Sequence, residues 1–432
     1  MVTTNVTGNI TTPPSTLERV LAPLIGALCV FATLTMWVDA AYLERSFEAA
    51  ILLLAAVVVM MRGPPRPCFI LLALTATALW GPLQLIARAS VYRYETWTAT
   101  LRWATLIATF FLTYEALGNR QTRQRSRTLL AAFGVAMAVF AVVQAYTSQG
   151  SYFWMFASGQ PQVFGPFQNP NNYAAFIELI LPLTLWEGLK RPRYRTAWLT
   201  MAGAMAASVV ASGSRAGSAL VAVEIPAVFA SAYISRQFPR RQVAAAFAEM
   251  AVVAALCLGA TGWETLRFRL TVMDPFLYRR EMLHSAIVMA KARPWNGFGL
   301  GTFSTVYPAY AVFDNGYFVN HAHNDWAEWA TEGGLPFLLL LGAMATASSL
   351  AALRSGWGMG LIVIYVHALV DFPMQRTGLA IWVFVVGAML AAEPFESERR
   401  QGESAGDQVR PRRAPVAENQ LDQRTVGQRL KA

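Results

Sequence analysis

The sequence predicts an all-α protein that crosses a membrane many times. Of its 432 residues, 55% are apolar and only 14% are charged, whereas soluble domains carry about one quarter charged residues. The mean hydropathy of +0.38 arises from long apolar runs, and these approach the roughly 20 residues that a helix needs to cross a bilayer. The composition therefore argues against a soluble enzyme.

The apolar runs predict about twelve transmembrane helices, taken here in chain order. The expected spans are 20–43, 47–61, 68–87, 98–117, 128–147, 172–189, 196–213, 216–235, 244–262, 334–353, 357–372 and 378–392. The 47–61 run is short, and only a few small residues separate 196–213 from 216–235. A long polar segment, 263–333, interrupts the series and is the one extramembrane piece large enough to fold.

Basic residues in the short loops predict the orientation of the chain. One set of alternate loops holds fourteen Lys and Arg residues and the opposite set holds five. Cytoplasmic loops collect Lys and Arg, so we expect both termini in the cytoplasm. The loops near 148–172 and 212–217, the segment 263–333 and the loop near 371–377 then face the far side of the membrane, which is the periplasm if the cell is Gram-negative.

The two ends of the chain differ from its apolar middle. Residues 1–17 are polar and contain no basic residue before Arg19, so they lack the features of a signal peptide and are expected to stay as a cytoplasmic segment. Residues 18–395 form the transmembrane domain. Residues 396–432 are rich in Arg, Glu, Gln, Pro and Gly and predict a disordered cytoplasmic tail, which either contacts anionic lipid through its basic residues or stays solvated.

Cysteine usage and net charge exclude several classes of function. Cys29, Cys68 and Cys257 each lie inside an apolar run, where a thiol behaves as a small hydrophobe. Neither a disulfide framework nor a zinc ligand set is implied. The formal charge of +10 is first a topology signal in a membrane protein, and nucleic acid is not an expected partner.

Arginines at the expected periplasmic side are candidates for binding an anion. Arg279 and Arg280 belong to a basic cluster in the 263–333 segment, and guanidinium groups match phosphate oxygens bidentately. The alternative is an amphipathic helix near 276–292 on the lipid surface. Arg215 lies between Ser212 and Gly217, a small-residue break at the membrane edge. There it either lines a ligand site, beside the N-terminus of the next helix, or snorkels to the interface.

A histidine pair precedes the tenth expected helix. His321 and His323 are two residues apart and are followed by Asn324 and Asp325. This spacing is a weak metal signal, and an imidazole with a carboxylate neighbour is better suited to accepting a proton near neutral pH. Asn324 or Asp325 alternatively serves only as the helix N-cap.

Further polar residues lie at the start of, or inside, expected spans. Asn169 and Asn171 belong to a turn-rich segment before the sixth span, where their amides either cap the helix or bind sugar hydroxyls. Glu178, Glu224 and Glu249 lie within spans. Carboxylates are costly in lipid and are functional candidates by default, with neighbouring arginines as the simpler explanation.

Four motifs occur in an order and spacing that resemble a known family. They are Gly-Pro-Phe-Gln-Asn-Pro-Asn-Asn-Tyr (165–173), Ser-Gly-Ser-Arg-Ala-Gly (212–217), the stretch from Tyr278 through Arg293-Pro294 to Gly301, and His-Ala-His-Asn-Asp (321–325) followed by Glu-Gly-Gly-Leu (332–335). The set resembles the bacterial O-antigen ligase and Wzy-type polysaccharide polymerase superfamily. The likeness extends to His367-Ala-Leu-Val-Asp371-Phe-Pro and covers roughly 160–392.

The resemblance implies an inner-membrane glycosyltransferase with a C-type glycosyltransferase-like helical fold and no metal or other cofactor. Such enzymes move a glycan en bloc, with inversion, from undecaprenyl diphosphate to lipid A-core, to a growing polysaccharide or, in some members, to protein. The resemblance implies that Arg215 and Arg279 or Arg280 hold the diphosphate, and that His323 or His321 activates the acceptor hydroxyl.

Two departures from the family pattern bear on these assignments. Leu283 and His284 stand where the family usually has a Trp after the loop arginine, so Arg279 is preferred over Arg280 without being fixed. The spacing from His323-Asn324 to Gly334 follows the ligase pattern and favours His323 as the base, but Phe337 stands where that pattern has Gly or Thr. A ligase is therefore the first expectation and a polymerase the second.

Two other classes of protein compete with the enzyme. A twelve-helix secondary transporter fits the span count, but transporters usually show internal repeats and a mid-membrane site, whereas the polar residues here gather in one periplasmic segment. An envelope scaffold without chemistry leaves the Arg and His residues unexplained.

Overall fold

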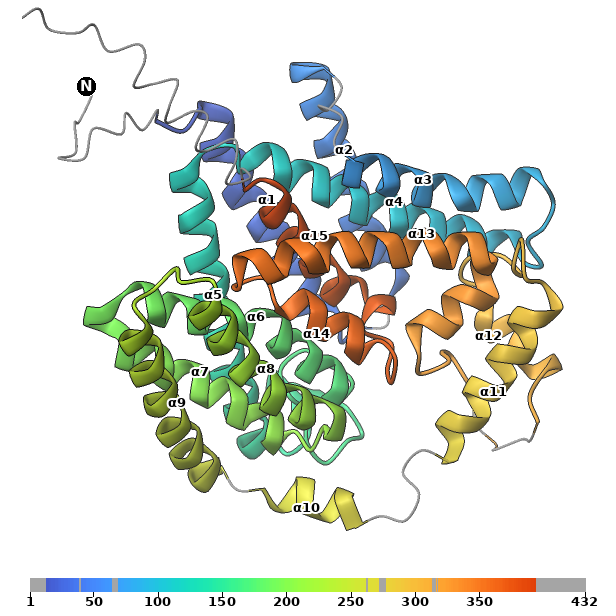
Figure 1. Cartoon of the computed structure of the whole chain (residues 1–432). Helices are drawn as coiled ribbons and strands as arrows, with labels where there is room; N and C mark the ends of the chain where they lie inside the picture. Colours follow the sequence, from blue (N-terminus) through green and yellow to red (C-terminus); the bar gives the residue numbers. More distant parts are fainter. Residues whose placement is uncertain are drawn as a thin grey trace, which may run out of the picture. The chain divides into compact units, whose positions relative to one another are not determined.

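A computed structural model of the chain describes residues 13–38, 40–63, 69–261, 263–271, 277–312, 316 and 318–393. Within these residues the chain is predominantly helical (Figure 1), with one small hairpin formed by β1 (Ser151–Tyr152) and β2 (Phe156–Ala157). The all-α class is confirmed at this level. The tail predicted for 396–432 lies outside the described residues, as does most of the 1–17 segment.

The first five helices follow the predicted runs, with one correction. They are α1 (Thr16–Thr35), α2 (Ala41–Arg62), α3 (Phe69–Ile86), α4 (Arg93–Ala116) and α5 (Arg120–Thr147). The break between the first two lies at residues 36–40, so the predicted boundary at 43–47 is wrong. α1 begins with a capping box in which Ser15 and Glu18 bond to each other's backbone N–H, a strong helix start.

The next four helices lie close to their predicted ranges, and the first of them is buried. They are α6 (Pro170–Lys190), α7 (Arg195–Ala211), α8 (Arg215–Ile234) and α9 (Arg240–Thr261). Every residue of α6 from Asn172 to Leu189 is buried, and the helix packs against α5, α7, α8 and α14 (Gly360–His367). A helix that is apolar all round belongs in the centre of a bundle.

The segment predicted as a large loop folds into short helices around a core of its own. It contains α10 (Glu264–Thr271), α11 (Leu277–Ala292), α12 (Phe303–Val306) and a 3₁₀ turn, η2 (Tyr307–Ala309). Met282 and Met289 of α11 pack with Phe298, Phe303 and Tyr307. The amphipathic helix expected near 276–292 is therefore present as α11, and its apolar face packs inward and against α13 (Asp325–Ser355) rather than lying wholly on lipid.

A kink divides α13. Gly334 has φ 72° and ψ −178°, and the Leu335 N–H donates to the Pro294 carbonyl over 2.7 Å. The Thr331 and Glu332 carbonyls accept from Phe298 and Gly299 over 2.9 and 3.0 Å. The Pro294–Gly301 segment thus satisfies backbone groups that the kink frees. Its Gly297 faces the kink, where an added Cβ would lie 2.2 Å from the Glu332 carbonyl oxygen.

The last two helices flank a turn that contains the buried Asp371. α14 has eight residues and ends at His367, so the span predicted for 357–372 is too long at its C-terminal end. The chain then turns at 368–371, passes through a 3₁₀ turn, η3 (Pro373–Gln375), and enters α15 (Thr377–Ala391). Eight helical residues extend about 12 Å, well short of the roughly 30 Å hydrocarbon core.

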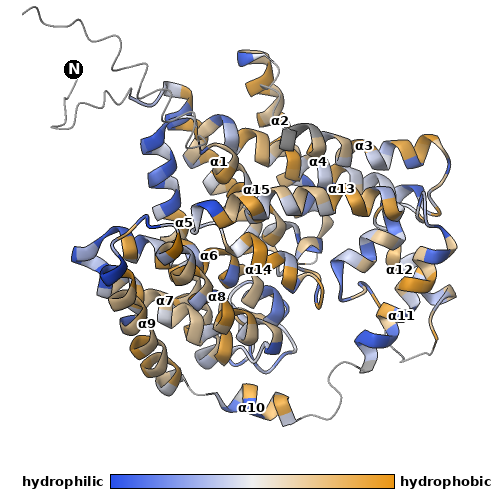
Figure 2. Cartoon of the chain, viewed as in Figure 1, coloured by the Kyte–Doolittle hydropathy of each residue, from blue (hydrophilic) through white to orange (hydrophobic). Residues whose placement is uncertain are grey.

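Within the described residues, five helices are long and apolar enough to cross a membrane: Thr16–Thr35, Arg120–Thr147, Arg215–Ile234, Arg240–Ala260 and Asp325–Ser355. Ala73–Ile86 and Thr377–Ala391 are shorter apolar helices. Figure 2 shows hydrophobic residues predominating on α8 and α15, whereas α11 carries a hydrophilic stretch. These features fit a helical membrane protein, and the twelve spans and their orientation stay predictions.

Candidate active site

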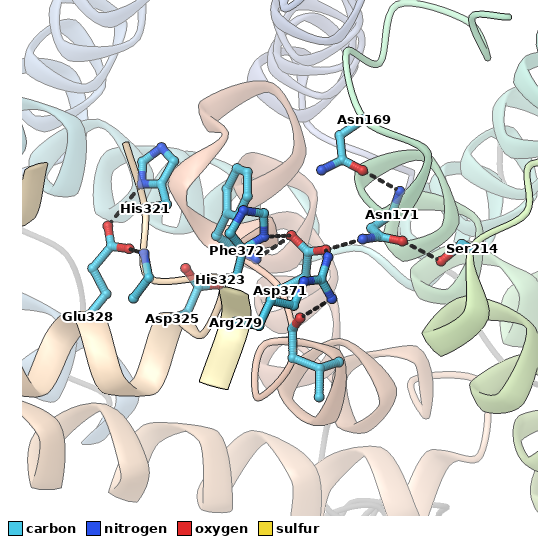
Figure 3. A network of polar contacts seen from close by, with 12 residues as sticks. Asn169, Asn171, Ser214, Arg279, His321, His323, Asp325, Glu328, Asp371 and Phe372 are labelled. Atoms are coloured by element: carbon cyan, nitrogen blue, oxygen red, sulfur yellow. Dashed lines mark hydrogen bonds and ion pairs between the residues drawn. The ribbon is translucent and has the colours of Figure 1, made fainter. Parts of the chain in front are cut away.

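A polar network lies where the N-termini of α6, α8 and α13 approach the turn that follows α14 (Figure 3). Asn169, Ser214 and Asn324 are the N-cap residues of these helices, and each side chain accepts a hydrogen bond from its own helix backbone. The N-terminus of a helix carries a partial positive charge and favours anions. The convergence of these ends makes the region suited to binding negative charge.

Asp371 is the centre of the network. Its side chain is 1% exposed. One carboxylate oxygen, Oδ2, accepts from Arg279 Nη2 over 3.1 Å and from Asn171 Nδ2. The other, Oδ1, accepts from the Phe372 N–H over 2.9 Å. Burial raises the pKa of this carboxyl, but the neighbouring His323 and Arg279 outweigh it and hold the pKa at about 2, so Asp371 is ionised at neutral pH.

Arg279 joins α11 to this turn. In addition to the Asp371 ion pair, its Nη1 donates to the Val370 carbonyl over 2.9 Å. The side chain keeps 27% of its surface exposed, so the guanidinium is held from one side and is accessible to a ligand from the other. A fixed, partly exposed guanidinium is the geometry that bidentate phosphate binding requires.

Asn171 connects Asp371 to the start of α8. Its Oδ1 accepts from Ser214 Oγ over 2.7 Å, and Ser214 Oγ in turn accepts from the Gly217 N–H over 3.1 Å. Gly217 lies close to α6, where an added Cβ would come within 2.5 Å of the Ala174 Cβ. Arg215 is the first residue of α8 and is half-buried, directly after the serine that belongs to the network.

His323 lies beside the same carboxylate. Its Nδ1 is 3.6 Å from Asp371 Oδ1, longer than a hydrogen bond but close enough for a small side-chain movement to make one. The ring packs edge-on against Phe372, with ring centroids 4.8 Å apart. His323 has φ 50°, an uncommon conformation for a residue with a side chain and one that clusters at functional sites.

His321 faces a different partner. Its Nδ1 is 3.0 Å from Glu328 Oε1, and the other oxygen of Glu328 accepts from the Ala322 N–H over 2.8 Å. The His321 ring stacks on Phe372 at 4.5 Å between centroids. Phe372 therefore contacts both histidines, which have different carboxylate partners, Glu328 and Asp371 (Figure 3).

The structure brings most of the predicted site residues together. Arg279, His323 and Asn171 surround Asp371, and Asn169 holds the Asn171 backbone N–H over 2.8 Å. Asn324 caps α13 and donates to the Leu369 carbonyl over 2.8 Å, so the N-cap alternative is correct for Asn324 rather than for Asp325. Arg280 follows Arg279 on α11 and is exposed.

The three carboxylates of the predicted spans have different surroundings. Glu249 pairs with Arg195 over 2.7 Å, the simple explanation given for it. Glu178 pairs with His367 over 2.8 Å, both fully buried. Glu178 thus lies beside His367, whereas the carboxylate beside His323 belongs to Asp371. Glu224 is 1% exposed.

No role for Asp371, Ser214 or Phe372 is predicted from the sequence. A signal for Asp371 exists in the His367-Ala-Leu-Val-Asp371-Phe-Pro motif. The i, i+4 spacing of that motif is typical of one helix face, yet α14 ends at His367 and the aspartate lies in a turn. Long-range contacts such as Asn171 to Asp371, two hundred residues apart, have no local sequence signal.

A comparison with known families finds a match for part of the chain. Residues 200–342 match the family model described as O-antigen ligase; the range runs from α7 into α13 and includes Arg215, Arg279 and His323. A search of curated proteins finds no match. This match covers about one third of the chain and supports its resemblance to the O-antigen ligase and Wzy-type polysaccharide polymerase superfamily of surface-polysaccharide biosynthesis.

Proposed function

We propose that the protein is an inverting, metal-independent glycosyltransferase of the bacterial inner membrane. It transfers a glycan en bloc from undecaprenyl diphosphate to a sugar hydroxyl of lipid A-core on the periplasmic face. The observation that carries the proposal is the arrangement around Asp371: a fixed guanidinium, converging helix N-termini and an imidazole within one network.

Arg279 and Arg215 stabilise the leaving group in this reaction. When the bond between the anomeric carbon and the diphosphate oxygen breaks, its electron pair stays on the diphosphate. Arg279 is held in place by Asp371 and Val370, so it meets this charge without reorganising. Preorganised donors of this kind lower the barrier, and losing one costs about 3–4 kcal/mol. The N-terminus of α8, where Arg215 lies, adds partial positive charge.

His323 is the proposed general base. The acceptor hydroxyl attacks the anomeric carbon from the face opposite the diphosphate, and its proton passes to the imidazole as the new C–O bond forms. Asp371 Oδ1 is positioned to accept from His323 Nδ1–H when the 3.6 Å separation closes, which leaves Nε2 to take the proton. A carboxylate that fixes the tautomer of a catalytic histidine has the same effect in hydrolase triads, and a general base contributes about 10²- to 10⁴-fold.

A Wzy-type polymerase is the second candidate, and one residue favours it. Phe337 is fully buried and stands where the ligase pattern has a small residue, and its ring packs edge-on against Trp103 at 5.7 Å between centroids. The two enzymes share the same donor and differ in acceptor, a growing chain instead of lipid A-core.

The test uses a strain without the native gene, complemented with wild type, Arg215→Ala, Arg279→Ala or His323→Ala. Lys291→Ala is the matched control, because Lys291 is an exposed cation on the same helix as Arg279. Surface glycan and the undecaprenyl-linked pool are measured beside the amount of protein in the membrane. We expect the three site variants to accumulate lipid-linked glycan and Lys291→Ala to behave as wild type.

The length of the accumulated glycan separates the two enzymes. Long unattached chains mean that a ligase is missing, whereas single repeat units mean that a polymerase is missing. If all the site variants support normal surface glycan at normal expression, the proposed site is wrong and the transporter and scaffold alternatives return.

A further inference from the structure

A polar cavity of about 360 Å³ lies beside His321. Its wall is built from α2, α4, α12, α13 and the segment after α14, and includes Glu44, Glu95, Arg102, Ser304, Glu328 and Gln375. The volume falls within the roughly 300–1,000 Å³ of ligand pockets. Asp371, Arg279 and His323 are not among the residues that line it, so the cavity is distinct from the Asp371 network.

The wall is already ordered by its own hydrogen bonds. Glu44 Oε1 accepts from the Thr377 hydroxyl over 2.6 Å, and Glu332 Oε1 accepts from the Phe303 N–H over 3.1 Å. Arg102 donates to the Gln375 carbonyl and to Gln375 Oε1 over 3.3 and 3.1 Å. A site whose polar groups are fixed before binding loses little entropy when a ligand enters.

Some polar groups in the wall are left for a ligand. Within the described residues, the Glu95 carboxylate makes no hydrogen bond or ion pair, although the residue is half-buried. Gln375 is 7% exposed and its Nε2 makes no hydrogen bond. Arg102 has no carboxylate at ion-pair distance in the described part of the chain. The cavity therefore offers acceptors and donors side by side.

The balance of charge indicates the class of ligand. Among the described residues of the wall, carboxylates come from Glu44, Glu95, Glu328 and Glu332 and guanidinium groups from Arg45, Arg102 and Arg376. Nearly equal numbers of carboxylates and guanidinium groups disfavour a diphosphate, because a diphosphate needs an excess of cations. A sugar hydroxyl both donates and accepts, so a mixed wall of this kind suits an uncharged polyhydroxy ring.

The position of the cavity indicates which substrate supplies that ring. His321 lines the cavity, Phe372 stacks on His321, and the same ring packs edge-on against His323, the proposed base. The arginine that holds the leaving diphosphate lies on the Asp371 side. In an inverting transfer the nucleophile and the leaving group are on opposite sides of the anomeric carbon. We propose that this cavity binds a sugar ring of the acceptor and delivers its hydroxyl to His323, an inference that rests on the proposed function.

The test is steady-state kinetics of the purified full-length protein. The donor is undecaprenyl-linked glycan and the acceptor is lipid A-core, both extracted from the strain that lacks the protein. Ser304→Leu fills the cavity from α12, and Thr305→Leu is its matched control, because Thr305 is exposed on the same short helix and does not line the cavity. Glu95→Gln removes a charge without changing volume.

We expect Ser304→Leu to raise the acceptor KM by about tenfold or more, the equivalent of losing one or two good contacts. We expect Glu95→Gln to raise it severalfold. The donor KM should stay within about twofold, and Thr305→Leu should match wild type in both. If Ser304→Leu does not fold, Glu95→Gln decides the question with the same readout.

The outcomes separate this inference from the function on which it rests. Wild-type protein that transfers no glycan between these substrates overturns both. If the wild type is active and the cavity variants change the donor KM, the cavity holds donor glycan. If the wild type is active and the cavity variants change neither KM, the cavity holds neither the donor nor the acceptor. In those two cases the proposed function stands and the acceptor site is refuted.

Discussion

At the scale of single residues, the two carboxylate oxygens of Asp371 have different contacts. Oδ2 holds Arg279 and Asn171, while Oδ1 faces His323. Asp371→Asn keeps the shape but removes the charge, so we expect kcat to fall about 100-fold or more because the base loses its orienting partner. The acceptor KM should stay within about threefold. Asp371→Glu should restore part of the rate, and a pure KM effect in the kinetic assay would contradict this role.

The same residue predicts how stability depends on pH. The pKa of Asp371 is lowered from 3.8 to about 2 in the folded protein, a difference that corresponds to about 2 kcal/mol. A lowered pKa gives stability that is present above the unfolded value and is lost as pH falls through the folded value. The Tm difference between wild type and Asp371→Asn in detergent should be present at pH 5 and should shrink below pH 4. A difference that is unchanged at pH 3 would refute the charged role.

Residue chemistry in the sequence was enough to find much of the site but not its centre. Arg279, His323, Asn171 and Asn324 were predicted because their types and positions near expected helix starts have a chemical meaning. Asp371 stood in a motif that read as part of a span. Asp371 is central because it contacts Arg279 and Asn171. These contacts arise from packing between segments that are distant in the sequence, so no local sequence pattern predicts them.

At the scale of elements, the kink of α13 links the helix to the segment before the site. Gly334 has φ 72°, and an added Cβ would lie 2.6 Å from the Trp295 carbonyl oxygen. Gly334→Ala should therefore destabilise the protein by about 1–3 kcal/mol. Gly342, on the same helix, has nothing within 4 Å of an added Cβ, and Gly342→Ala should be neutral or stabilising by up to about 1 kcal/mol. Thermal unfolding of the two variants in detergent measures the difference. Equal Tm values would mean that the kink is not required.

Helix positions were predictable to within a few residues where an apolar run ends in a turn signal. α6 begins at Pro170 after its Asn169 cap, and α8 begins at Arg215 after Ser214, both close to the predicted starts. α13 begins nine residues before its predicted start at 334, because the first turns carry Asp325, Glu328 and Glu332 and are not apolar. These carboxylates are buried by tertiary contacts, which hydropathy does not detect.

At the scale of the whole molecule, the positive-inside pattern predicts which side of the membrane holds the site. α5 is 28 residues long, about 42 Å at 1.5 Å per residue, and exceeds the roughly 30 Å hydrocarbon core. Gln124 is exposed near its start, among the arginines expected in the cytoplasm, and Gln160 is exposed in the loop after its end. A label at each position therefore reports one complete crossing.

The measurement places single cysteines at Gln124, Gln160 or Thr305 in a protein whose native Cys29, Cys68 and Cys257 are replaced by serine or alanine. Thr305 is exposed on α12, next to Ser304, which lines the proposed acceptor cavity. With a membrane-impermeant maleimide we expect labelling of Gln160→Cys and Thr305→Cys in intact spheroplasts, and labelling of Gln124→Cys only after permeabilisation. Long loops cross membranes regardless of their charge, so the charge pattern alone does not fix the side of the 263–333 segment. Labelling at Thr305 is therefore the most stringent test of the predicted orientation. If it labels only after permeabilisation while Gln160→Cys labels from outside, the site faces the cytoplasm and a lipid-linked donor presented in the periplasm cannot be its substrate.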